Sequence, residues 1–178
     1  IGHSTQQIYP LKDKDYKLTQ HHVIGHISLN KFQIEDFKLD ILSELGYYFS
    51  KHQLLNKWFT TIKYFDDFPE DFQQKMLENK TIHQLAAHLG MTFNWHFNPR
   101  VAIFGYSSIG PMWTSQQTER LAAGLDFSDD IGLGIKVKYK EYFWISSTFV
   151  LRHESNADLK FPSSGHNTIG VRLGLLFN

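Results

Sequence analysis

The chain has 178 residues, enough for one domain, and its 18 basic residues balance 18 acidic ones. This neutral charge argues against a nucleic-acid-binding protein, and the lack of cysteine excludes disulfides, thiolate metal sites and thiol nucleophiles. Aromatic residues make up 15% of the chain, which excludes intrinsic disorder, while the apolar runs are too short for a membrane-spanning helix.

The first part of the chain predicts strands. Residues 1–8 are expected to be the remnant of a first strand, and residues 18–30 form a second candidate. In the third, residues 33–50, six of the seven odd positions from Phe37 to Phe49 are apolar, and the charged residues Asp36, Lys38, Asp40 and Glu44 are at even positions. Successive side chains of a strand face opposite sides, so this alternation predicts one apolar and one polar face.

Residues 51–80 break the alternation and predict a long loop with a short helix. The segment 66–70 combines carboxylates with Pro69, a combination typical of a helix start. Phe68, Phe72 and Met76 then recur at helical spacing. Such a helix would pack on the rim of the fold or contact a membrane surface.

Alternation returns at His83 and continues to Phe97, followed by candidate strands at 100–113, 120–139, 142–155 and 168–178. We expect the strand 83–97 to end in a hairpin at Pro99. We expect the strand 120–139 to bend near residues 128–130 and to end in a hairpin at Glu141. Together the segments predict an all-β fold of eight antiparallel strands in a single domain, residues 1–178.

Alternation alone does not say which face points inward, but the composition of the polar face does. It combines glycines with charges of both signs, which suits the crowded interior of an eight-stranded barrel, where charges must be paired. Its members are Asp36, Lys38, Asp40, Glu44, Gly90, Arg120, Asp126, Gly132, Gly134, Lys136, Lys138, Arg152 and Arg172. His88 and His96 share this face, so we expect them to form hydrogen bonds inside the barrel and not to bind a metal.

The last strand, with alternate apolar residues up to Phe177, is similar to the C-terminal signal of bacterial outer-membrane proteins. The patterns therefore favour an eight-stranded antiparallel transmembrane β-barrel with its apolar face toward lipid. The alternative is a soluble lipocalin-like carrier with the apolar face inside.

Three polar residues interrupt the apolar face near a turn that contains Pro162 and Gly165. His153 and Ser155 are two positions apart on one strand, and Asn167 shares the apolar face of the next. Polar residues at a membrane rim are ordinary. The second interpretation is a serine nucleophile activated by histidine, with a third group that orients the histidine.

The run His153-Glu-Ser-Asn-Ala157, followed by Pro162 and Gly165, resembles the PagL-type lipid A 3-O-deacylases, which are eight-stranded outer-membrane barrels. The segments 118–124 and 130–134 are also similar to this family. The resemblance covers residues 80–178 well and the N-terminal half weakly.

The resemblance implies that His153 is the general base, Ser155 the nucleophile and Asn156 the oxyanion-hole residue. Asn167 stands where the family often has Glu. An Asn oxygen can accept a hydrogen bond from histidine but adds no charge, and in serine proteases an Asp-to-Asn change costs about 10⁴ in rate. Asp158 or another carboxylate is a candidate substitute, whereas Glu154 should point inward.

The activity implied is hydrolysis of the 3-O-linked acyl ester of lipid A in the bacterial outer membrane, with the active site near the outer leaflet. Lipopolysaccharide is the implied substrate, and no metal or other cofactor is required. The alternative is a catalytically inactive barrel with a structural or surface-binding role, which Asn167 keeps open. The sequence leaves acyl-chain preference and oligomeric state open.

Overall fold

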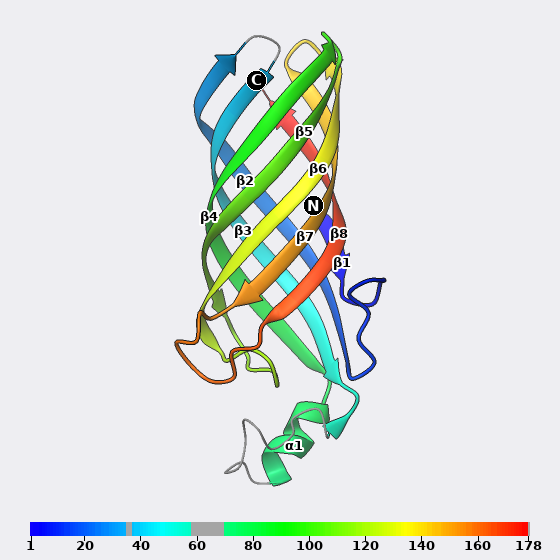
Figure 1. The fold of residues 1–178 in the computed structure, drawn as a ribbon, viewed down its shortest axis with the longest axis vertical. Coiled ribbons are helices and arrows are strands. Elements are labelled where there is room, and N and C mark those ends of the chain that lie inside the picture. Colours follow the sequence, from blue (N-terminus) through cyan, green and yellow to red (C-terminus); the bar gives the residue numbers. More distant parts are fainter. Residues whose placement is uncertain (35–36, 58–69, 178) are drawn as a thin grey trace.

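The computed structural model describes residues 1–34, 37–57 and 70–177. Within these residues the chain forms a closed barrel of eight antiparallel strands, in which each strand pairs with its neighbours in sequence and the last pairs with the first (Figure 1). The strands are β1 (Gly2–Thr5), β2 (Tyr16–Ile34), β3 (Phe37–Leu54), β4 (Lys80–Asn98), β5 (Val101–Thr114), β6 (Gly124–Lys140), β7 (Phe143–Ser155) and β8 (His166–Phe177). The predicted all-β barrel is confirmed.

The two ends of the barrel differ in the length of their connections. At one end, near the C-terminus, residues 99–100 join β4 to β5 and residues 141–142 join β6 to β7, as the predicted hairpins require. At the other end the connections are long: 6–15, 55–79, 115–123 and 156–165. The helix α1 (Glu70–Leu77) extends from this second end (Figure 1).

Several predicted boundaries need correction. The loop predicted at 51–80 is shorter, because β3 continues to Leu54 before the connection starts. The strand predicted from residue 120 begins at Gly124, so Arg120 lies in a connection and not on the polar face. No bend interrupts residues 128–130, whose register with β5 is unbroken. The predicted helix start at 66–69 and the polar-face residue Asp36 lie outside the described residues.

The helix packs on the rim of the barrel. Met76 of α1 is buried against Tyr16, Leu18 and Leu54, which lie at the ends of β2 and β3. This contact corresponds to the predicted rim position. No helix in the described parts of the chain is long and apolar enough to cross a membrane.

The apolar face of each strand points outward. On β6, Leu125 and Leu133 are 59% and 73% exposed, whereas Asp126 and Asp130 are almost fully buried in the interior. The same alternation holds along β4, β7 and β8. The outward orientation is therefore confirmed, and the lipocalin-like alternative, which needs the apolar face inside, is wrong.

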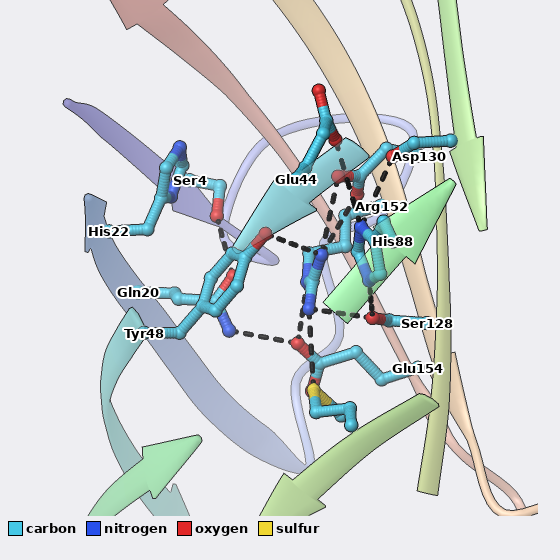
Figure 2. A network of polar contacts seen from close by, with 12 residues as sticks. Ser4, Gln20, His22, Glu44, Tyr48, His88, Ser128, Asp130, Arg152 and Glu154 are labelled. Atoms are coloured by element: carbon cyan, nitrogen blue, oxygen red, sulfur yellow. Dashed lines mark hydrogen bonds and ion pairs between the residues drawn. The ribbon is translucent and has the colours of Figure 1, made fainter. Parts of the chain in front are cut away.

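The interior is filled by a network of buried charges and amides (Figure 2). The Arg152 guanidinium donates to Glu154 at 2.8 Å and to Asp130 at 3.1 Å, and it stacks over the Tyr48 ring at 3.8 Å. Arg172 reaches the same Asp130 carboxylate at 2.6 Å. Each of these four charges, on Arg152, Glu154, Asp130 and Arg172, thus has a partner of opposite sign, which offsets the cost of removing it from water.

His88 lies in this network, as expected from its position on the polar face. One of its ring nitrogens lies 2.7 Å from the Ser128 hydroxyl and the other 3.2 Å from the Ser108 hydroxyl. These contacts link β4 with β5 and β6 through the interior of the barrel.

Candidate active site

His153 and Asn167 meet on the outer wall of the barrel, at the end with the long connections. The two residues are directly opposite each other in the register of β7 and β8. His153 Nδ1 lies 2.8 Å from Asn167 Oδ1, so the ring N–H donates to the amide oxygen. This contact fixes the orientation and the tautomer of the imidazole, and it leaves Nε2 with a free lone pair.

Ser155 occupies the next outward position on β7, where the strand ends. Since Nδ1 is engaged by Asn167, Nε2 is the ring nitrogen available to its hydroxyl. Among the described residues no hydrogen bond joins Ser155 Oγ to His153.

Glu154, between the two, points inward as expected. Its carboxylate accepts hydrogen bonds from Gln20, Gln84 and Arg152, each at 2.8 Å. These contacts commit Glu154 to the interior network and keep it off the face that carries His153.

Asn156 is fully buried and shapes the turn that follows the serine. Its side-chain NH₂ donates to the carbonyls of Lys160 and Pro162. The next residues, Ala157 and Asp158, adopt positive φ angles of 51° and 58°. The Asn156 amide thus holds the turn from inside.

A second connection braces this turn. Arg120 Nε donates to the Gly165 carbonyl at 2.6 Å, and the Gly165 N–H donates back to the Arg120 carbonyl at 2.9 Å. Ala122 N–H also donates to the Pro162 carbonyl. The connections 115–123 and 156–165 therefore form one unit beside the site.

Gly165 places this unit against the histidine. Its φ is +69°, and a Cβ built on it would lie 3.3 Å from His153 Cε1 and 2.3 Å from the Glu154 carbonyl oxygen. Only glycine fits this position without displacing the backbone. The sequence reasoning used Gly165 as a family marker, but its role against the ring was visible only in the structure.

Beneath the site lies a buried polar pair. Glu119 and His52 are in contact at 3.1 Å, and both side chains are inaccessible to solvent. Burial alone would raise the pKa of the Glu119 carboxyl, but the hydrogen bond from His52 holds this pKa below its usual value. The pair ties the connection 115–123 to the end of β3.

The structure also places a carboxylate that the sequence reasoning did not single out. Asp129 of β6 is directly opposite His153 of β7 and is exposed on the outer wall. The signal was present in the sequence, because Asp129 has the same parity as the apolar residues Phe127 and Ile131. Asp158 lies in the exposed turn, and no hydrogen bond or ion pair joins it to His153 among the described residues.

No group of three or more His, Asp or Glu side chains in the described residues is arranged to hold a metal ion.

Residues 37–175, more than three quarters of the chain, match the family model for lipid A 3-O-deacylase (PagL). The chain belongs to this family. The match to the PagL family reaches well into the N-terminal half, where the resemblance read from the motifs was weak. No curated protein matches the chain.

One solved structure has a similar fold. The barrel is similar to the crystal structure of the outer membrane enzyme PagL, with a TM-score of 0.66 and 16% identity over 97% of this chain and 95% of that one. A second match, OmpT, an outer membrane protein of Vibrio cholerae, has a TM-score of 0.29 and 6% identity over 93% of this chain and 52% of that one. The PagL family and the barrel fold together identify an outer-membrane β-barrel.

Proposed function

We propose that this PagL-family barrel is a serine esterase that hydrolyses the 3-O-linked acyl ester of lipid A. Ser155 is the nucleophile, His153 the general base and Asn167 the residue that orients the base. The observation that carries the proposal is the 2.8 Å contact between His153 Nδ1 and Asn167 Oδ1, beside Ser155 on the lipid-facing wall.

In the first half of the reaction, Ser155 Oγ attacks the ester carbonyl carbon while its proton moves to His153 Nε2. The tetrahedral intermediate then expels the sugar hydroxyl, which takes that proton. The backbone N–H groups at 157–158 are assigned to the developing oxyanion, since the Asn156 side chain is committed to the turn carbonyls. In the second half, water attacks the acyl-enzyme with His153 again as base, and a fatty acid leaves.

The outer wall suits this substrate, because the acyl chains of a lipid lie against it. An apolar hollow of about 510 Å³ on the same wall is lined by residues that include Ile131, Phe149 and Leu151. Leu151 is the outward residue that precedes His153 on β7. We propose that the ester approaches Ser155 from the outer leaflet, because barrels of this class carry their longer loops on the extracellular side.

The test is mass spectrometry of lipid A from a Gram-negative host that expresses the chain with a signal peptide. We expect the loss of one 3-hydroxyacyl group with the native sequence and none with Ser155→Ala at equal amounts of folded barrel. Folding is checked by the shift in electrophoretic mobility on heating. Unchanged lipid A with a folded native barrel would refute the proposal and favour the catalytically inactive alternative.

A further inference from the structure

The site as described lacks a negative charge on the residue that orients the base. Proton transfer from Ser155 turns His153 into an imidazolium, and a carboxylate nearby stabilises that cation. Asn167 accepts the Nδ1–H but is neutral. An esterase with this arrangement gains from a carboxylate elsewhere around the ring.

Asp129 lies where such a carboxylate would be useful. It is opposite His153 on β6, on the side of β7 away from Asn167. Residues directly opposite on antiparallel strands have Cβ atoms about 4.5–5.5 Å apart, so the carboxylate and the imidazole share one patch of the outer wall.

Without such a role, a charged side chain at the position of Asp129 would be energetically unfavourable. Its outward neighbours on β6 are Phe127 and Ile131, and Ile131 is 61% exposed toward lipid. A charged side chain in a lipid-facing stripe is unfavourable unless it has a function or a partner. None of the hydrogen bonds or ion pairs of the described residues involves the Asp129 carboxylate, so structural pairing does not explain it.

The other charged groups around His153 do not take this role. On β7 itself, Arg152 and Glu154 point inward and pair with each other. In the connections, Arg120 donates a hydrogen bond to the Gly165 carbonyl. Asp158 and Lys160 belong to the exposed turn. On the β8 side Asn167 faces the ring, and His166 turns inward to Thr118.

We propose that Asp129 is a positioning residue that stabilises protonated His153 from the β6 side, in place of the charge that Asn167 lacks. Asp129 acts electrostatically, through His153. This proposal rests on the proposed esterase function. The charge of Asp129 lowers the barrier to proton transfer from Ser155 to His153.

The first test compares Asp129→Asn with the native protein in the hydrolysis of lipid A in detergent micelles. The substitution keeps the shape of the side chain and removes its charge. We expect kcat/KM at neutral pH to fall about tenfold, the order of one partly screened charge pair. We also expect the acidic limb of the pH profile to move toward lower pH, because the imidazolium loses a neighbouring negative charge.

A merely structural role would lower the rate at every pH without moving the limb. Asp158→Asn is the matched control, because it removes a nearby carboxylate at a φ of 58° that Asn also tolerates. We expect this control to leave the limb in place. An unmoved limb in Asp129→Asn, or an equal displacement in Asp158→Asn, would overturn the proposal.

A second readout does not depend on esterase activity. In Ser155→Ala, the reaction of His153 with diethyl pyrocarbonate reports the fraction of neutral imidazole at each pH. Trypsin cuts after Arg152 and Lys160, and the peptide 153–160 contains one histidine, so mass spectrometry isolates its signal. Adding Asp129→Asn should move the midpoint of this curve to lower pH.

The two readouts separate the two hypotheses. A displaced modification midpoint in a protein that leaves lipid A unchanged would support the Asp129–His153 coupling and refute the esterase function. An active enzyme whose midpoint does not respond to Asp129→Asn would retain the esterase function and refute the coupling.

Discussion

Replacing Asn167 by Asp tests how this residue acts on His153, the proposed general base. Asp has the same shape as Asn, so Oδ1 can keep its place 2.8 Å from His153 Nδ1 while gaining a negative charge. A hydrogen bond to a neutral acceptor contributes about 0.5–1.5 kcal/mol, and one to a charged acceptor about 1.5–3 kcal/mol. The difference, about 1–1.5 kcal/mol, corresponds to a rise in kcat/KM of roughly tenfold.

The size of the gain distinguishes two orientations of the Asn167 amide. If Oδ1 accepts from Nδ1–H, the native protein already has the catalytic tautomer, and Asn167→Asp adds only the charge. If the amide nitrogen donated instead, the tautomer would be wrong, as in serine proteases, where the loss is about 10⁴.

The assay is the initial rate of acyl release from purified lipid A in micelles, followed by mass spectrometry, with equal amounts of folded barrel. Asn167→Ala is the matched control, and we expect it to lose activity because the ring is no longer oriented. A gain near 10⁴ in Asn167→Asp would refute the assigned hydrogen bond. No gain at all would show that the third position does not act on the base.

Three further predictions concern the framework of the site. Arg152→Met leaves Glu154 buried without its cation and should lower the free energy of unfolding, measured in urea, by about 3–5 kcal/mol. Gly165→Ala places a Cβ 2.3 Å from the Glu154 carbonyl oxygen and should lower kcat/KM, whereas the control Gly25→Ala, which meets no atom within 4 Å, should not. Because His52 holds the pKa of Glu119 below its ordinary 4.5, stability from this pair is lost as pH falls below that value, and Glu119→Gln should flatten the acid limb of the unfolding temperature.

The architecture was predictable because a lipid-facing barrel obeys one simple rule, alternation. Leu125 and Leu133 are at odd positions of β6 and are exposed, whereas Asp126 and Asp130 are at even positions and are buried. The composition of the polar face also predicted its location, since mixed charges such as Arg152 and Glu154 are stable only where they can pair.

The details of the site were less predictable, because they depend on contacts across strands and loops. The pairing of Asp129 with His153 follows from the register between β6 and β7, which alternation does not define. The inward turn of the Asn156 side chain follows from carbonyls four and six residues further along the chain. The brace from Arg120 to Gly165 joins two loops that are 45 residues apart.

The buried ion pairs of the interior fix the strand register on which the outer site depends. On β7, Arg152 and Glu154 face inward while His153 and Ser155 face outward, so the same strand carries the packing and the chemistry. A shift of one residue in register would turn His153 and Ser155 into the barrel and Arg152 and Glu154 toward lipid. Because Arg152 binds Asp130 across the β6–β7 pair and Arg172 binds it from β8, the buried charges fix the alignment of the three strands. That alignment brings Asp129, His153 and Asn167 side by side on the opposite face.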